Sequence, residues 1–169
     1  PGFIDLHVHG GGGSEILNGT YEAVDAMSKV HGAGGTTAFL PSTATASYDD
    51  LVSAILVTLE AMEKGTSGSQ VLGINLEGPY LNVKKKGAQS EEYVRMPDLE
   101  EFEELWRISQ GIIKMITVAT ELEGAKAFIE AVKAKGIRVS AGHSDATYAQ
   151  AMEGFQAGIS HGTHVFNAM

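Results

Sequence analysis

Two histidines stand one residue apart near the start of the chain, at the end of the apolar run FIDLHVHG. Side chains alternate between the two faces of a strand, so His7 and His9 point the same way. Two imidazoles at a strand end are costly to bury without partners, and a divalent metal ion would satisfy both. A hydrogen-bonded pair explains the same spacing, so the motif alone leaves a metal site and a structural pair open.

Three further candidate ligands follow other apolar runs. Glu77 follows VLGINL, where a partly buried carboxylate needs a cation or strong donors, unless it belongs to a loop or a helix cap. His143 lies in SAGHSDAT, and the alternative to a metal ligand there is a surface histidine that contacts the start of a helix. In SHGTHVFNAM we choose His164, because the strand is expected to end there; His161 faces the other side and is a supporting candidate.

One glutamate and two or more histidines make an open metal site that keeps a position for water. A metal at such a site lowers the pKa of its water toward about 7 and polarises a carbonyl group, which is the chemistry of hydrolysis. We expect zinc, although iron(II), manganese and cobalt accept the same ligands. The remaining histidine considered, His31, stands beside Gly32 at a helix end and is predicted to lie on the surface.

The elements that must position these side chains alternate along the chain. Strands are predicted at residues 3–8, 36–41, 71–76, 112–118, 137–141 and 159–165, and helices at 21–30, 47–64, 99–108, 125–135 and 146–156. The first of these strands is predicted to be buried. Ser47 and Asp98, each with an acidic residue three positions later, predict N-terminal caps for two of the helices. Glycines such as Gly65 and Gly136 predict where helices end.

Strands that alternate with helices predict a parallel α/β sheet, either open and doubly wound or closed into a barrel. The candidate ligands follow four different strands, and a barrel collects its site from several strands at their carboxyl ends. An open sheet places its site mainly at one switch point. We therefore predict a TIM-barrel-like (β/α)8 fold, of which residues 1–169 form a partial catalytic domain with about the first six β/α units. A stable six-stranded unit is the alternative.

The composition argues against several other classes of function. The 12 basic and 21 acidic side chains give a net charge of −9, which opposes binding to nucleic acid or to an anionic membrane surface. The basic run Lys84–Lys86 could meet a small anion or form a solvated loop. There are no cysteines, so any metal is held by histidine and carboxylate. No apolar run approaches the roughly 20 residues of a membrane span, and no signal peptide is visible, so we expect a cytoplasmic protein.

Four segments in this order carry a resemblance to a known family: PGFIDLHVHGGGG, LEGPYLNVKKKGAQ, AGHSDAT and HGTHVFNAM. Together they resemble the N-acetylglucosamine-6-phosphate deacetylases of the amidohydrolase superfamily, over almost the whole chain. The resemblance implies a metal-dependent hydrolase that converts N-acetylglucosamine 6-phosphate to glucosamine 6-phosphate and acetate. It also implies a homodimer with shared sites.

The resemblance assigns metal ligands. Glu77, His143 and His164 match the family's metal-binding glutamate and two histidines. His7 and His9 match the His-x-His that supports a second metal in some members, so either one or two ions are expected.

The resemblance also assigns substrate contacts. Ala88 matches a position that lines the sugar pocket. Gln89 follows it where the family usually has histidine, which leaves the sugar contact and the exact substrate open. Asn167 and Ala168 match the pair that contacts substrate near its phosphate.

By the same resemblance, the catalytic general-base aspartate, the phosphate-binding arginine and the histidine donated by a neighbouring subunit lie beyond Met169. Part of a small β-sandwich domain lies there too, and its other part precedes Pro1. Asp145, the nearest carboxylate, is predicted to cap the helix that follows it. We therefore expect this piece alone to bind metal weakly and to turn over nothing.

Two other functions stay open on the sequence. One is an amidohydrolase that acts on a different amide, such as a cyclic amide or an aminoacyl group. The other is a non-catalytic remnant that binds a metal or a sugar phosphate, which the missing general base would favour.

Overall fold

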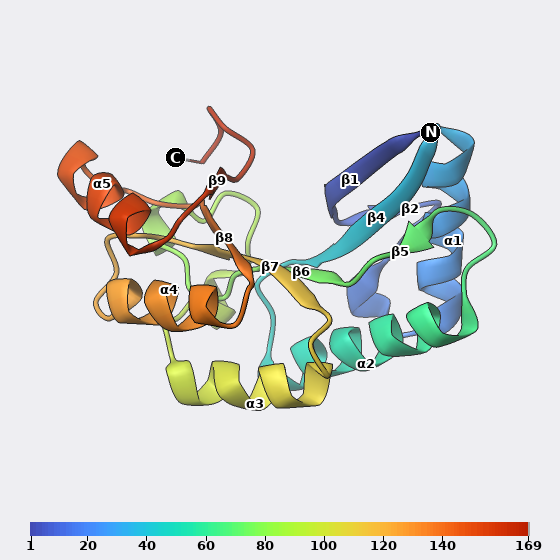
Figure 1. Cartoon of the computed structure of the whole chain (residues 1–169), viewed down its shortest axis with the longest axis horizontal. Helices are drawn as coiled ribbons and strands as arrows, with labels where there is room; N and C mark the ends of the chain where they lie inside the picture. Colours follow the sequence, from blue (N-terminus) through green and yellow to red (C-terminus); the bar gives the residue numbers. More distant parts are fainter. Residues whose placement is uncertain (169) are drawn as a thin grey trace. The chain divides into compact units, whose positions relative to one another are not determined.

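In a computed structural model the chain alternates strands and helices, and the structure describes residues 1–168 (Figure 1). These residues form two compact units. The first unit comprises Pro1–Thr43, Ser47–Asn75 and Glu104–Lys114, and the second comprises Ala44–Ala46, Leu76–Glu103 and the residues from Met115 onward. The predicted ligands Glu77, His143 and His164 all belong to the second unit, whereas His7 and His9 belong to the first.

The first unit contains three parallel strands. β1 (Phe3–Val8) pairs with β4 (Thr36–Thr43), and β4 pairs with β5 (Gln70–Val71). A short antiparallel pair, β2 (Gly10–Gly11) with β3 (Ser14–Glu15), follows β1 and leads into the 3-10 turn η1 (Ile16–Asn18). The glycine-rich segment after the two histidines therefore turns the chain away from β1.

Two helices complete the first unit beside β4 and β5 (Figure 1). They are α1 (Tyr21–Ala33) and α2 (Tyr48–Lys64). The Ser47 hydroxyl accepts a hydrogen bond from the Asp50 backbone at 3.2 Å, and α2 ends at Gly65, as predicted. Their buried side chains form the core of the unit with Ile16 and Phe39: Val24, Met27, Leu51 and Ile55.

The second unit contains the parallel strands β7 (Ile113–Val118), β8 (Arg138–Ala141) and β9 (His161–Gly162), in that order. β7 and the preceding β6 (Ile74–Glu77) begin in the first unit and end in the second. The helices are α4 (Ala125–Ala134) and α5 (Tyr148–Ala157), which pack together, and α3 (Leu99–Ser109) begins in this unit. Two 3-10 turns, η2 (Val83–Lys85) and η3 (Glu91–Tyr93), lie in the loop after β6.

Aromatic side chains centre the core of the second unit. The Phe128 ring of α4 meets the Tyr80 ring edge-on at 4.8 Å and the Phe102 ring at 5.3 Å. Such pairs contribute about 0.5–1.5 kcal/mol each beyond their burial. The Tyr80 hydroxyl donates to the Glu101 carboxylate at 2.8 Å, and burial is the first cause that raises the pKa of Tyr80 far above its usual value. The loop after β6 is thus fixed to α3 and α4.

The predicted strand at residues 71–76 is wrong, because β5 and β6 are separate and Gly73 lies between them. Gly73 has φ +145°, and a Cβ at this position would collide with the Ile112 carbonyl oxygen. The Ile74 amide donates to the same oxygen at 2.9 Å. The close approach of two backbones therefore breaks the strand, and the apolar run gave no sign of it.

The predicted strand at residues 159–165 is also too long, since β9 covers only His161–Gly162. The backbone leaves the extended conformation by His164, which has φ +30°. The helix predicted at residues 146–156 begins at Tyr148, and Thr147 caps it through the Gln150 amide. Asp145 is therefore not the cap, and its carboxylate lies 3.5 Å from the Lys85 ammonium instead.

Two burial predictions are wrong as well. The first strand was predicted to be buried, but the side chains of Phe3 and Ile4 are 75% and 61% exposed. His31 was predicted on the surface, but it is half-buried, with Nε2 3.1 Å from the Gly10 carbonyl oxygen and its ring against Phe39. Within residues 1–168, no helix has the length and apolar character that crossing a membrane requires.

Candidate metal centre

Three predicted ligands converge in the second unit. Nε2 of His143 and Nε2 of His164 lie 3.2 Å and 3.0 Å from the same oxygen, Oε1 of Glu77. The two imidazole nitrogens are 3.1 Å apart, and the rings are almost perpendicular, with an interplanar angle of 87°. Glu77 is almost fully buried, whereas the His164 side chain is 32% exposed. One side of the cluster therefore opens toward solvent.

The outer nitrogens of both histidines are already committed to backbone carbonyl groups. Nδ1 of His143 lies 2.8 Å from the Lys85 carbonyl oxygen, and Nδ1 of His164 lies 2.9 Å from that of Asn167. A carbonyl oxygen only accepts, so each Nδ1 carries the proton and donates it. In the neutral imidazoles each Nε2 then presents a lone pair toward the Glu77 carboxylate. Three electron-rich atoms facing one another require a cation or an added proton.

The spacing of the three atoms fits a divalent metal. Ligand atoms about 2.0–2.1 Å from a tetrahedral zinc ion are about 3.3–3.4 Å from one another. The separations here, 3.0–3.2 Å, are slightly shorter. A carbonyl that holds the outer N–H of each histidine is also the usual outer contact of a metal-binding histidine. The donor set therefore fits a metal with three protein ligands and an open position.

Proton binding offers a substitute for the metal at His143. Burial lowers the pKa of His143, but the hydrogen bonds with the Glu77 carboxylate and the Lys85 carbonyl raise it and outweigh burial. The net direction is upward from the ordinary histidine value. Proton and metal therefore compete for the same Nε2.

The strand ends and two unusual backbone positions place the three ligands. Glu77 is the last residue of β6, whereas His143 follows β8 and has φ +49°. Beneath them the buried Thr163 hydroxyl lies 2.9 Å from Thr117 Oγ1 and 2.7 Å from Ser140 Oγ. This hydroxyl cluster ties β7 and β8 to the residue immediately before His164.

The second oxygen of Glu77 also has a partner. The Gln89 side-chain amide donates to Glu77 Oε2 at 2.8 Å, and its carbonyl accepts from the Thr45 backbone amide at 2.6 Å. Gln89 is 6% exposed. The resemblance placed Gln89 among the substrate positions and left its sugar contact open, and it did not reveal the contact with Glu77.

A second residue that the sequence analysis missed is Glu121, which anchors the His143 loop. Its carboxylate accepts from Asn82 Nδ2 at 2.9 Å, from the Asp145 backbone amide at 2.6 Å and from the Ser144 hydroxyl. The backbone carbonyl of His143 accepts a hydrogen bond from the backbone amide of Asn82 at 2.9 Å. No motif marks Glu121, because its partners come from separate parts of the chain.

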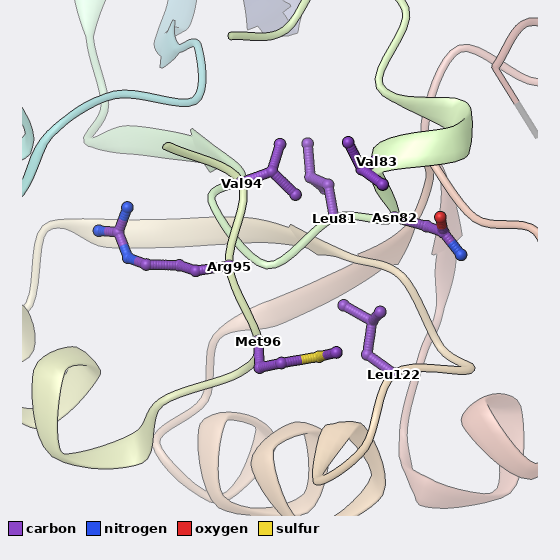
Figure 2. Close-up of a pocket in the computed structure, with 7 residues that line it drawn as sticks. All are labelled: Leu81, Asn82, Val83, Val94, Arg95, Met96 and Leu122. Carbon is purple, nitrogen blue, oxygen red and sulfur yellow. The ribbon is translucent and has the colours of Figure 1, made fainter. Parts of the chain in front are cut away.

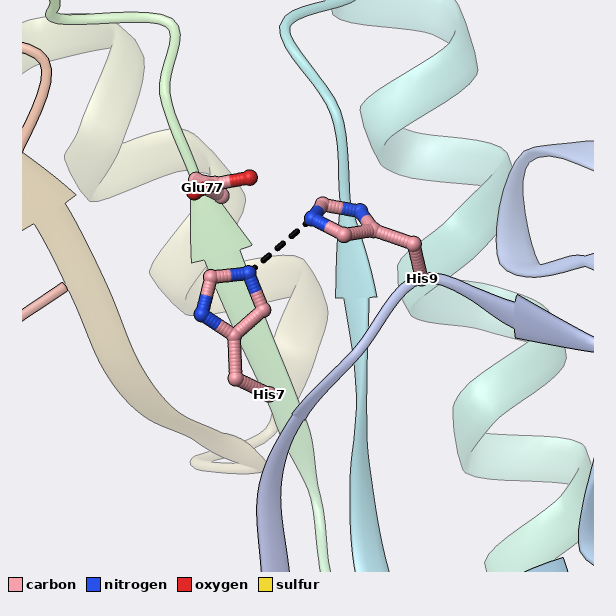
Figure 3. A group of neighbouring side chains, drawn as sticks. All are labelled: His7, His9 and Glu77. Carbon is pink, nitrogen blue, oxygen red and sulfur yellow. Dashed lines mark hydrogen bonds between the residues drawn. The ribbon is translucent and has the colours of Figure 1, made fainter. Parts of the chain in front are cut away.

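The two early histidines form a pair in the first unit. Nε2 of His7 lies 2.9 Å from Nε2 of His9, drawn as the dashed line in Figure 3. The prediction that both side chains point the same way is confirmed. The backbone amide of His7 donates to the Asp5 carboxylate at 3.1 Å. Two facing imidazole nitrogens can form a hydrogen bond or bind a cation. The geometry is therefore compatible with both a structural pair and a metal site.

The predicted substrate contacts fall partly around the three-ligand cluster. A Cβ built on Gly87 would lie 3.6 Å from the His143 ring and 3.8 Å from the Ala168 Cβ, so Ala168 lies beside the cluster. Asn167 reaches it through its backbone carbonyl, and its side chain is exposed. Ala88 is exposed as well. His161 contacts its neighbour Ser160 at 2.8 Å and is not one of the three converging ligands.

A groove of about 360 Å³ lies elsewhere in the second unit (Figure 2). Its walls are mainly apolar side chains, with two polar ones: Leu81, Val83, Val94, Met96, Leu122, Asn82 and Arg95. The Arg95 guanidinium donates to the Glu101 carboxylate at 3.0 Å and to the Ala46 carbonyl at 3.2 Å. None of these lining residues is a predicted metal ligand, and Asn82 connects the groove to the His143 loop.

Comparison with known proteins agrees with the geometry. The chain is 37% identical over 172 residues to the N-acetylglucosamine-6-phosphate deacetylase of Bacillus subtilis (strain 168), covering 100% of this chain and 43% of that relative. It is 34% identical over 169 residues to the N-acetylgalactosamine-6-phosphate deacetylase of Escherichia coli O157:H7, covering 100% of this chain and 45% of that relative. The chain thus spans less than half the length of these relatives.

Solved structures give the same result. One is a Mycobacterium smegmatis N-acetyl-D-glucosamine-6-phosphate deacetylase variant in complex with N-acetyl-D-glucosamine-6-phosphate. Its TM-score is 0.94 at 35% identity, covering 100% of this chain and 43% of that one. For the N-acetylglucosamine-6-phosphate deacetylase from Pasteurella multocida the TM-score is 0.91 at 36% identity, covering 99% and 44%.

These likenesses confirm the predicted fold class, a partial TIM-barrel-like α/β domain. The profile of the Amidohydrolase family matches residues 1–169. Because that match extends over every residue of the sequence, the chain belongs to the amidohydrolase family.

Proposed function

We propose that this chain carries the metal centre of a deacetylase that acts on N-acetylated amino-sugar 6-phosphates. The reaction is hydrolysis of the N-acetyl amide of N-acetylglucosamine 6-phosphate. Water adds to the acetyl carbon, the carbon–nitrogen bond breaks, and acetate and the free amine of glucosamine 6-phosphate leave. The relatives that are named for this activity support the choice of substrate.

The observation that carries the proposal is the convergence of Glu77 Oε1 with the two Nε2 atoms of His143 and His164. A divalent metal held there would lower the pKa of a water molecule toward about 7 and polarise the acetyl carbonyl. The three side chains would hold that ion, and the carbonyl groups of Lys85 and Asn167 would keep both imidazoles in the required tautomer. Zinc is the ion that we propose.

Further roles extend the proposal. His7 and His9, whose Nε2 atoms lie 2.9 Å apart, would bind a second ion. Ala88 would line the sugar, and Asn167 and Ala168 would contact substrate near its phosphate. The general base is proposed to come from an aspartate outside residues 1–169. The working protein is proposed to be a cytoplasmic homodimer.

A second substrate is supported by one specific likeness. The relative from Escherichia coli O157:H7 at 34% identity is named for N-acetylgalactosamine 6-phosphate. That sugar carries the same acetamide and the same phosphate. A pocket wall that differs at one or two positions could therefore decide between the two sugars.

The test uses protein expressed from its complete natural reading frame. Acetate release is measured with N-acetylglucosamine 6-phosphate, N-acetylgalactosamine 6-phosphate and the same sugars without phosphate. We expect turnover of one 6-phosphate, loss of that turnover after chelation, and its return with zinc. Absence of turnover with every sugar, despite a full complement of bound metal, would support the non-catalytic alternative. A cyclic amide is assayed in parallel by its ring opening, and its turnover in place of the sugars would support the other amidohydrolase.

A further inference from the structure

The side chain of Gln89 is held at both ends inside the second unit. Its Oε1 accepts from the Thr45 backbone amide at 2.6 Å, and its Nε2 donates to Glu77 Oε2 at 2.8 Å. The orientation of the amide is determined by chemistry, because the Thr45 N–H can only donate and the carboxylate can only accept. Gln89 is 6% exposed, so water does not readily replace either contact.

The two oxygens of Glu77 therefore have different partners. Oε2 receives the Gln89 amide, whereas Oε1 faces the histidine nitrogens at 3.0 Å and 3.2 Å. A carboxylate whose second oxygen is held in this way presents one oxygen, in a fixed direction, to an ion between the imidazoles. The donor is also neutral, so the full negative charge of Glu77 stays available to that ion.

The side-chain carbonyl of Gln89 is held by a backbone group, the Thr45 amide, which fixes the position of the Gln89 side chain. Thr45 belongs to the short segment Ala44–Ala46 of the second unit, and the Gln89 backbone amide donates to the Lys86 carbonyl at 3.0 Å. The loop after β6, which carries Gln89, also contains Lys85, whose carbonyl orients His143. One loop therefore orients two of the three candidate ligands.

We propose that Gln89 is a positioning residue that holds Glu77 as a one-oxygen metal ligand, and that it does not bind the sugar through its side-chain amide. The inference rests on the proposed function, since it takes Glu77 as a ligand. Its side-chain carbonyl is occupied by Thr45 and its amide by Glu77. The second N–H and the second lone pair of the amide lie on a side chain that is only 6% exposed, so little of either group is open to a sugar hydroxyl.

The test compares Gln89→Met and Gln89→Leu with the unsubstituted protein, expressed from its complete natural reading frame. Both variants remove the donor and keep a side chain of similar bulk. Gln156→Met is the matched control, because Gln156 is an exposed residue of α5. Each protein is loaded with cobalt(II), its visible absorption spectrum is recorded, and zinc affinity is measured by competition with a chromophoric chelator.

We expect zinc affinity to fall about 10–100-fold in both Gln89 variants, the usual effect of removing an outer partner of a ligand. The cobalt spectrum should change in intensity and position, because Glu77 is free to rotate or to bind through both oxygens. A purely structural role would lower thermal stability and leave the spectrum unchanged. The control should match the unsubstituted protein.

An unchanged cobalt spectrum and an unchanged zinc affinity in either folded Gln89 variant would overturn the inference. If one variant does not fold, the other decides, and if neither folds, the inference is rejected in favour of a structural role. Glu77→Gln separates the two proposals. If that variant binds zinc as well as the unsubstituted protein, the proposed metal centre itself fails; if it loses zinc and the Gln89 variants do not, only the role of Gln89 fails.

Discussion

Nε2 of His143 and Nε2 of His164 lie 3.1 Å apart, although the two residues follow different strands. Each ring donates its other N–H to a backbone carbonyl, so both lone pairs point at the carboxylate oxygen of Glu77. Two lone pairs that face a buried carboxylate oxygen destabilise the site when it holds no cation, and a bound cation makes the same arrangement favourable.

Glu77→Gln should abolish high-affinity zinc binding. The substitution keeps the size of the side chain but removes its negative charge. Loss of an outer contact usually costs about 10–100-fold in affinity, so loss of a ligand should cost more than about 100-fold. Zinc content per chain after dialysis measures this. Glu153→Gln, at an exposed position of α5, is the control and should retain its zinc.

Glu121→Gln should weaken zinc binding by about 3–10-fold without removing a ligand, as expected for a supporting contact. Glu121 accepts hydrogen bonds from Asn82, Ser144 and the Asp145 backbone, and a glutamine amide would face one of these donors with a donor. The loop that carries His143 should loosen. Chelator competition measures the affinity, and Glu123→Gln at the exposed neighbouring position is the control. Equal affinities for the Glu121 variant and the unsubstituted protein would show that the loop is held by other contacts.

Thr163→Val should lower the free energy of unfolding by about 1–3 kcal/mol, because the Thr117 and Ser140 hydroxyl groups lose a buried partner. Valine has nearly the same shape, so the loss reports the hydroxyl group. Urea unfolding of the metal-free protein measures it. Ser160→Ala, at an exposed position of the same segment, should change stability much less. A Thr163→Val protein as stable as the parent would contradict the role assigned to this hydroxyl cluster.

Asp25 should make stability depend on pH. The Lys29 ammonium, 2.7 Å away, is the first cause that lowers the pKa of Asp25, and the Ser67 backbone amide adds to it. A lowered pKa in the folded state means that the ionised group stabilises the fold above the unfolded value of about 3.8. That stabilisation is lost as pH falls through the folded pKa.

Asp25→Asn should therefore lower the free energy of unfolding at pH 7 by about 1–2 kcal/mol, and the difference from the parent should shrink below about pH 3.8. Chemical unfolding at a series of pH values measures both curves. Asp49→Asn, at an exposed position in the first turn of α2, is the comparison. A difference that stays constant from pH 7 to pH 3 would contradict the charge argument.

The sequence predicted the three converging ligands because their signal is local. Glu77 and His143 follow apolar runs, and His164 lies near the end of a predicted strand. The carboxyl ends of parallel strands gather at one edge. The helix starts at Ser47 and Asp98 were also readable, since each capping side chain lies three residues from the amide that it binds.

What the sequence did not reveal depends on contacts between distant segments. Gln89 meets Thr45 and Glu77 across 44 and 12 residues of chain, and no spacing rule covers such a contact. The break at Gly73 follows from the approach of the Ile112 carbonyl. The early end of β9 follows from the backbone turn at His164, which also orients the imidazole. A pattern of apolar residues gives no sign of such a turn.

The most direct measurement is anomalous diffraction at the zinc absorption edge, from zinc-loaded crystals of the protein. We expect a strong peak about 2.0–2.1 Å from Glu77 Oε1 and from Nε2 of both His143 and His164. Peaks confined to other places, with these three side chains arranged as in the metal-free protein, would contradict it.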